Sequence, residues 1–219
     1  MDVAIAMGVF LLSHVTISRT RVKPFLVARL GTRAYLAAYS ILSVALLAWV
    51  IAALLQSPRV WLWPSPAWAY PFALVVSAAA FALIGIGAVV RNPLSVAFRS
   101  QDFDPERPGI VGWIRHPLIW GLGLWGLAHV PANGDWPSLL LFAGSALFAL
   151  TGARAVERRK KRQLGETEWR DLASGPGSLD GAALLGAALG LALWVLLLLL
   201  HPLLFGVDPL AITEALFFL

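Results

Sequence analysis

The sequence predicts an all-α polytopic membrane protein: a helical bundle of about six transmembrane helices in a single domain over residues 1–219. Of its 219 residues, 59% are hydrophobic and only 13% are charged, and the mean hydropathy is +0.77. A soluble domain is less apolar and carries more charge. Several apolar runs also approach or exceed the roughly 18–20 residues that cross a bilayer. The ten tryptophans fit the same class, because tryptophan is favoured at membrane interfaces.

Charges, prolines and glycines delimit the predicted spans. We expect them at residues 3–17, 34–55, 67–90, 117–130, 137–153 and 182–204. Span three contains Gly85 and Gly87, which we interpret as small packing residues. Span four starts at Pro117, which suits a first helical turn, and at about 14 residues it is only about 21 Å long. Spans four and five therefore form a short hairpin, and the apolar tail 205–219 is expected to lie along the membrane surface.

The distribution of basic residues predicts the orientation in the membrane. Of the 17 Lys and Arg residues, 16 lie in three connections, 19–33, 91–115 and 154–170. With six spans, these connections share one side, which the positive-inside rule makes cytoplasmic. We therefore expect a multi-pass membrane protein with both termini outside, which in a bacterial inner membrane is the periplasm. Topology explains the positive charge, so a nucleic-acid partner is not required, and the run 154–171 is expected to be a solvated helix that extends span five.

The four histidines are the candidate functional residues, because all of them lie inside or at the end of apolar runs. An ionisable group in such a run is costly unless a partner or cofactor compensates it. Each could hydrogen-bond a neighbouring helix, or they could ligate a metal or carry protons. Zinc is disfavoured, since the sequence has no His-x3-His pair. Haem needs only one or two axial imidazoles, and the absence of cysteine excludes thiolate ligation. The four are His14, His116, His129 and His201.

Arg115-His116-Pro117 opens the fourth span and has two interpretations. Arg115 could be a positive-inside anchor and Pro117 a helix start, which leaves His116 as an interfacial residue. Alternatively, Arg115 and His116 form a cytoplasmic-face site for a phosphate, a carboxylate or a haem propionate. Arg19 and Arg21 are further candidates for pairing with a propionate.

Five motifs in this order and spacing resemble the NnrU family, over nearly the whole chain. They are His14 with the basic residues after it, Gly31-Thr32-Arg33-Ala34-Tyr35, Arg115-His116-Pro117, Leu127-Ala128-His129 and His201-Pro202-Leu203. The resemblance implies a multi-span membrane protein that binds haem b. It also implies one of two roles: a carotenoid cis–trans isomerase acting on a lipid-phase carotene, as in the related 15-cis-zeta-carotene isomerase, or an accessory in denitrification, the reduction of nitrite and nitric oxide.

Carried over by motif, the resemblance implies His14 and His129 as the axial ligands of haem. The 15-cis-zeta-carotene isomerase of plants, called the plant isomerase below, has a cysteine three residues before the second of these histidines. This chain has Gly126 at that position. The predicted topology places His14 near the cytoplasmic side and His129 toward the outer side. His116 is therefore kept as a substitute partner, and His14–His116 or His129–His201 are better matched by depth.

The sequence also shows a weaker likeness to membrane methyltransferases of the isoprenylcysteine carboxyl methyltransferase type. The residues that carry it are Arg115-His116-Pro117, Asn133, Glu157 and Gly165-Glu166-Thr167-Glu168-Trp169. In that family a pair of glutamates and a Gly-x-x-Tyr motif stand where this chain has Glu157-Arg158 and Trp169. The likeness implies a cytoplasm-facing site for S-adenosylmethionine.

Overall fold

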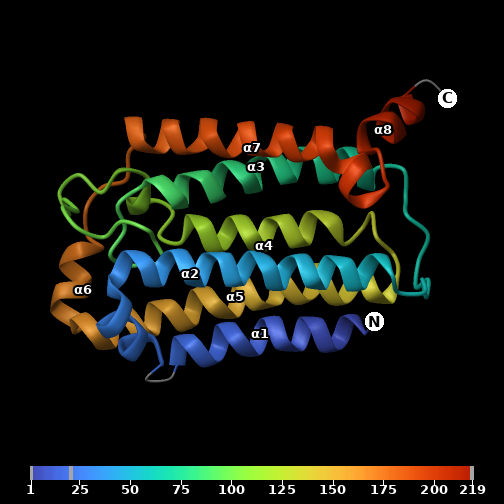
Figure 1. Cartoon of the computed structure of the whole chain (residues 1–219). Helices are drawn as coiled ribbons and strands as arrows, with labels where there is room; N and C mark the ends of the chain where they lie inside the picture. The colour runs from blue at the N-terminus through green and yellow to red at the C-terminus, as the bar shows by residue number, and fades with distance from the viewer. Residues whose placement is uncertain (1, 20–21, 218–219) are drawn as a thin grey trace. The chain divides into compact units, whose positions relative to one another are not determined.

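The computed structural model describes residues 2–19 and 22–217, which form eight α-helices and one short 3-10 helix (Figure 1). The helices are α1 (Val3–Arg19), α2 (Val22–Leu55), α3 (Ala69–Val89), η1 (Gly109–Gly112), α4 (Pro117–His129), α5 (Trp136–Leu164), α6 (Glu166–Leu172), α7 (Gly181–Phe205) and α8 (Pro209–Phe217). Helices α2, α3, α5 and α7 are long and apolar enough to cross a membrane, and α1 contains a shorter apolar stretch. The predicted helical membrane bundle is confirmed.

The first of two compact units contains the chain up to Pro64 together with Gly134–Leu141. Within it, α1 packs against α2. The tryptophan-rich segment after α2 is irregular, as expected, and pairs with the start of α5. Leu62 N donates to Gly134 O at 2.7 Å, and Trp136 N donates to Val60 O at 2.8 Å. An ion pair between Arg59 and Asp135, at 3.5 Å, holds the same two segments together.

Helix α2 begins earlier than predicted, because residues 22–30 are helical rather than part of a plain connection. Gly31 then interrupts the helix with φ 77° and ψ 160°. A side chain is strained in this region of backbone space, so glycine is the residue that permits the kink. The predicted second span thus corresponds to the part of α2 that follows Gly31.

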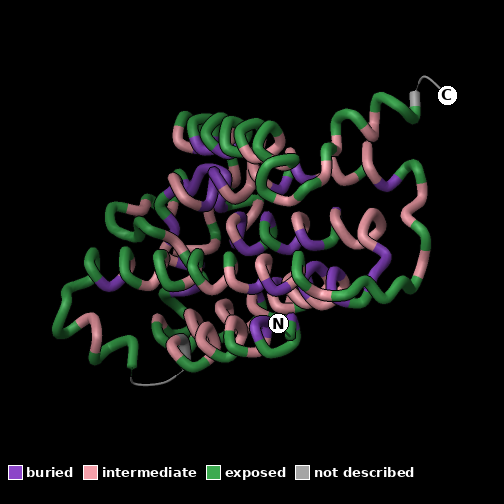
Figure 2. The backbone as a smooth tube through the Cα atoms, turned by 45° about the vertical axis from the view of Figure 1, so that its right-hand side comes forward, coloured by how far each residue is buried: buried purple, intermediate pink, exposed green. Residues whose placement is uncertain are grey.

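The second unit contains Ser65–Asn133 and Phe142–Leu219, and α3 is its central helix. Helix α3 packs against both α4 and α7, which run parallel to each other and antiparallel to α3 (Figure 1). A Cβ at Gly85 would overlap the main chain of Gly186, and one at Gly87 would lie 2.5 Å from Leu118. The packing role expected for both glycines is confirmed. Figure 2 shows that α7 is mostly exposed elsewhere, consistent with a surface in contact with lipid.

The α4–α5 hairpin forms as predicted, with Pro117 in the first turn of α4. The helices approach closely at Gly126, where an added Cβ would lie 2.6 Å from Phe142 O. Helix α5 continues without interruption to Leu164, so the predicted helical extension of span five is confirmed as far as that residue. Gly165, with φ 85°, ends it, and the rest of the run 154–171 belongs to the separate helix α6. The tail contains a separate short helix, α8.

The long connection between α3 and α4 is irregular apart from η1, as its prolines predict. It nevertheless has a core of its own, in which Leu94, Ile110 and Val111 pack with Trp169 of α6. Because Val90 at the end of α3 and Ala183 of α7 join this cluster, the connection is fixed against the ends of three helices. This core places α6 beside the start of α4.

Candidate functional site

The loop before α4 is held in place by a buried asparagine. Asn92 is 1% exposed, and its Nδ2 donates to Arg115 O at 2.9 Å. Its Oδ1 accepts from Leu94 N at 3.0 Å. Both polar ends of the amide are therefore satisfied inside the protein, as burial requires. The consequence is that Ser95 and His116, which are 21 residues apart, come into contact.

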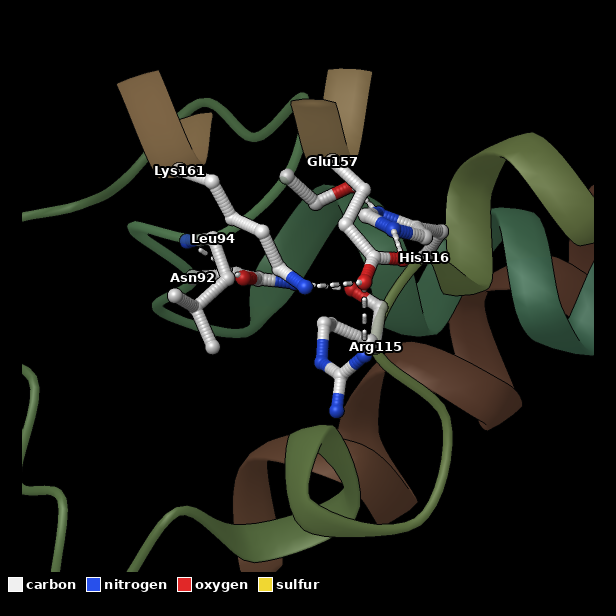
Figure 3. Close-up of polar contacts among 7 residues, drawn as sticks. Asn92, Leu94, Arg115, His116, Glu157 and Lys161 are labelled. Carbon is white, nitrogen blue, oxygen red and sulfur yellow. Dashed lines mark hydrogen bonds and ion pairs between the residues drawn. The ribbon is translucent and has the colours of Figure 1, made fainter. Parts of the chain in front are cut away.

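Four side chains from the α3–α4 connection and α5 form a polar cluster around the Glu157 carboxylate (Figure 3). Arg115 Nη1 lies 3.6 Å from Oε1, Lys161 Nζ 3.5 Å from Oε1 and His116 Nε2 3.8 Å from Oε2. Lys161 is one helical turn after Glu157, so the two side chains share a face of α5. The cluster is confined to the second unit and lies at the end of α5 that carries its basic residues.

Trp169 of α6 completes the cluster. Its ring lies 3.9 Å from Lys161 Nζ and 4.9 Å from Arg115 Cζ, measured to the ring centroid. Both distances are within the range of cation–π attraction. The two cations therefore bridge one carboxylate and one aromatic ring, and we call Arg115, His116, Glu157, Lys161 and Trp169 the Glu157 cluster.

His116 lies in the connection just before α4 and is 4% exposed. Its Nδ1 is 2.7 Å from Ser95 Oγ. A bare Nε2 lone pair facing the Glu157 carboxylate would be repelled, so we infer that Nε2 carries the proton and that Ser95 O–H donates to Nδ1. Burial lowers the pKa of His116; the nearby Glu157 carboxylate opposes this shift and Arg115 adds to it. His116 is thus favoured in its neutral form.

His129 lies at the opposite end of α4 from His116. Thirteen residues of helix correspond to about 20 Å, so His129 and the Glu157 cluster are separate sites. Nδ1–H of His129 donates to Trp125 O at 2.8 Å. Its ring stacks on Phe142 of α5, with centroids 4.7 Å apart and an interplanar angle of 18°.

His201 has a similar environment near the end of α7. Its Nδ1–H donates to Val207 O at 2.8 Å, and Phe205 packs against its ring edge-on. His201 and His129 belong to the same compact unit. Since α4 and α7 run parallel (Figure 1), these two histidines occur at corresponding helix ends. Their pairing as haem ligands stays a prediction.

His14 belongs to the first unit. Its Nδ1 is 2.8 Å from Phe10 O, and its ring lies edge-on to Tyr39, with centroids 5.5 Å apart. The structure thus places Arg115 and His116 in one cluster, and His129 and His201 at corresponding ends of two parallel helices. The side chain of Arg19 and the whole of Arg21 lie outside the described residues.

Sequence reasoning missed Asn92, Ser95 and Lys161. Asn92-Pro93 gives only a turn signal, and nothing local identifies Ser95 as the partner of a histidine 21 residues away. The four-residue spacing of Glu157 and Lys161 on a predicted helix was a usable signal for Lys161.

The residues that carried the methyltransferase likeness divide between two places. Arg115, His116, Glu157 and Trp169 meet in the Glu157 cluster. Asn133 instead follows α4 at its other end, where Nδ2 donates to His129 O at 2.8 Å. One member of the expected constellation is therefore about 20 Å of helix away from the rest.

Comparison with known proteins identifies the family. Residues 3–209 match the family model described as NnrU protein. No curated protein and no solved structure matches the chain. The match covers nearly the whole chain and agrees with the first of the two resemblances, whereas nothing in these comparisons supports the methyltransferase likeness. The chain belongs to the NnrU family.

Proposed function

We propose that this NnrU-family protein is a haem b-binding protein of the bacterial inner membrane, with both termini in the periplasm. The observation that carries the proposal is the hydrogen bond from Nδ1–H of His129 to Trp125 O. It fixes the neutral tautomer in which Nε2 has a lone pair, which is the form that ligates a metal. The aromatic residues that contact this ring, Trp125 and Phe142, add an apolar surface beside it.

The same tautomer is favoured at two of the other histidines. His14 and His201 also hold Nδ1 against a main-chain carbonyl oxygen. At His116, by contrast, Nδ1 faces a serine hydroxyl and Nε2 faces a carboxylate. The hydrogen bonds of the ring nitrogens therefore fit haem ligation by His14, His129 and His201. They do not favour His116, the substitute ligand proposed from the sequence.

We take His129 as one axial ligand, and the second comes from His14 or His201. The family resemblance supports His14, while the position of His201 in the same unit as His129, at the corresponding end of a parallel helix, supports His201. Bound haem would supply an iron centre that changes oxidation state. The protein would orient the ligand rings through the Nδ1–H bonds and exclude water with the surrounding aromatic side chains. Arg115 lies at the opposite end of α4 from His129, so it is not favoured as the partner of a propionate of that haem.

Gly126 favours an electron-transfer role, as in a denitrification accessory, over a carotenoid isomerase. In the plant isomerase a cysteine stands at this position. Here a Cβ would lie 2.6 Å from Phe142 O and 3.1 Å from Ala146 N, so the hairpin has no room for a cysteine without a shift of α4 against α5. A reversible redox spectrum without turnover of ζ-carotene would support the electron-transfer role, and turnover would favour the isomerase.

The absorption spectrum of the purified protein, after expression with ample haem, tests the proposal. We expect a Soret band in the wild type, its loss in His129→Ala and its retention in His116→Ala. Comparison of His14→Ala with His201→Ala assigns the second ligand. A wild-type protein that is folded but shows no Soret absorbance would overturn haem binding.

An S-adenosylmethionine-dependent methyltransferase remains the second candidate, because Arg115, Glu157 and Trp169 converge. It predicts S-adenosylmethionine binding that Arg115→Ala and Glu157→Ala abolish. The remote position of Asn133 weighs against it. Binding of haem without binding of S-adenosylmethionine would eliminate this candidate.

A further inference from the structure

The Glu157 cluster contains two buried nitrogen atoms without a hydrogen-bond partner. They are Trp169 Nε1 and His116 Nε2. The Glu157 carboxylate faces His116 Nε2 at 3.8 Å, which is beyond hydrogen-bond distance, and no residue that the structure describes accepts a hydrogen bond from either atom. The two residues are 4% and 9% exposed. A buried donor without an acceptor is costly, and such atoms are uncommon in native proteins. An acceptor supplied from outside the described chain would remove this cost.

The charges around these nitrogens indicate the sign of the missing acceptor. Arg115 and Lys161 are cations, and among the described residues Glu157 is the carboxylate that forms ion pairs with them. His116 is favoured in its neutral form. The cluster therefore has a net positive charge. The three nitrogen–oxygen distances to Glu157, from 3.5 to 3.8 Å, exceed those of strong charge-assisted hydrogen bonds. Arg115 and Lys161 therefore both keep N–H groups that can donate to a second anion.

The aromatic ring of Trp169 excludes the opposite class of ligand. A cationic ligand such as a quaternary ammonium group needs an aromatic face. In this cluster Arg115 and Lys161 already lie over the ring. What the indole still offers is its N–H, which is a donor only. The ligand that suits the Glu157 cluster is therefore a negatively charged hydrogen-bond acceptor.

Part of the cluster is exposed and part is buried. The Arg115, Glu157 and Lys161 side chains are 34%, 31% and 35% exposed, whereas His116 and Trp169 form the buried part. This combination of buried donors and partly exposed cations suits a small charged group that enters from the aqueous or headgroup side.

We propose that the Glu157 cluster is a binding site for a phosphate group, in which His116 Nε2–H and Trp169 Nε1–H donate to its oxygens and Arg115 and Lys161 balance its charge. Phosphate offers several acceptor oxygens, and arginine and lysine are its usual partners in proteins. The group comes either from a soluble phosphate compound or from the headgroup of an anionic phospholipid. The site is independent of the haem proposal, because it lies at the opposite end of α4 from His129.

Indole N–H resonances of the full-length protein provide the test. The protein is labelled with 15N at its ten tryptophans and purified in a neutral detergent, and Trp169→Phe identifies the resonance of Trp169. We expect a saturable downfield shift of this resonance with inorganic phosphate, and none with sodium chloride at the same ionic strength. Arg115→Gln and Lys161→Gln should weaken the apparent affinity by about tenfold or more, the scale of one lost charge-assisted bond.

Arg170→Gln is the matched control. Arg170 is on the same helix as Trp169, but its partner is Glu166, at 3.3 Å, and its side chain is 71% exposed. This variant should bind phosphate like the wild type. Thermal unfolding provides a second measurement for variants whose spectra are poor. Phosphate should raise the Tm of the wild type but not that of Trp169→Phe, because phenylalanine keeps an aromatic ring and lacks the N–H.

Lipid nanodiscs distinguish the two sources of phosphate. A shifted Trp169 resonance in phosphatidylglycerol, but not in phosphatidylcholine, identifies a lipid headgroup, and a shift with inorganic phosphate alone identifies a soluble compound. Either outcome supports the site. It is overturned if neither form of phosphate shifts the resonance, if Arg115→Gln responds like the wild type, or if only S-adenosylmethionine produces a shift.

Discussion

Ser95 Oγ lies 2.7 Å from His116 Nδ1, although the two residues are 21 positions apart in the chain. Asn92 brings the two residues together, because its side chain donates to Arg115 O and accepts from Leu94 N. The buried Asn92 side chain therefore fixes the position of the α3–α4 connection relative to the residues that begin α4.

Replacement of Asn92 by alanine should destabilise the protein. The change removes the side-chain partner of Arg115 O and of Leu94 N. Because buried polar groups without a partner are costly, we expect the free energy of unfolding to fall by about 1–3 kcal/mol. Unfolding in mixed micelles, followed by circular dichroism, measures it. Asn133→Ala removes a similar side-chain bond at a half-buried site and should cost less; equal losses would contradict the role given to Asn92.

The stability of the protein should depend on pH through His116. Burial lowers its pKa from the ordinary 6.5, so below pH 6.5 the unfolded chain binds a proton more readily than the folded protein does. The contribution of His116 to stability is therefore fully present above pH 6.5 and is lost as the pH falls toward the lowered pKa. The Tm measured from pH 8 to pH 5 should fall less steeply in His116→Gln than in the wild type. Parallel curves for the two proteins would be inconsistent with this assignment.

Gly31→Ala should weaken the first unit through the backbone alone. Gly31 has φ 77°, and an added Cβ would meet nothing within 4 Å. The expected cost of about 1–3 kcal/mol thus comes from backbone strain. Gly8 in α1 also has nothing within 4 Å of an added Cβ, but it has ordinary helical geometry, so Gly8→Ala should be neutral or stabilising by up to about 1 kcal/mol. Thermal unfolding in detergent compares the pair, and similar effects of both changes would refute the strained kink.

Gly126→Cys should destabilise the α4–α5 hairpin. The new side chain would meet Phe142 O at 2.6 Å and Ala146 N at 3.1 Å, and such overpacking typically costs about 1–3 kcal/mol. Gly152→Cys is the matched control on α5, because its Cβ would meet nothing within 4 Å. The Tm of the two variants, measured under reducing conditions, should differ clearly. A Gly126→Cys protein as stable as the control would show that the hairpin accommodates the residue found in the plant isomerase.

The sequence was sufficient to predict the helical class, because apolar runs long enough to span a bilayer leave few alternatives. Local signals were also reliable at Pro117, which begins α4, and at Gly85 and Gly87, which contact neighbouring helices. The helical segment 22–30 was missed, since its basic residues resembled a loop and the Gly31 kink has no unique local signature.

The candidate sites were only partly predictable. Arg115 and His116 stand out because they flank a helix start, but their contacts with Ser95 and Glu157 depend on long-range packing that one sequence does not reveal. His129 and His201 lie at corresponding helix ends because α4 and α7 run parallel, which an alternating count of spans already implies. The ligand pair carried by the family motif remains a prediction.

The shortness of α4 has a consequence for hydration. At about 20 Å, α4 is shorter than the roughly 30 Å hydrocarbon layer, so a helix that starts at one surface ends while still below the other. Irregular backbone within the hydrocarbon layer requires polar partners from the protein itself, and the main chain around the end of α4 has two. Ser65 Oγ donates to Ala132 O at 2.7 Å and Asn133 Nδ2 donates to His129 O at 2.8 Å. These two side chains satisfy carbonyl oxygens at the end of α4, so the turn that follows the helix does not need water molecules for those two groups.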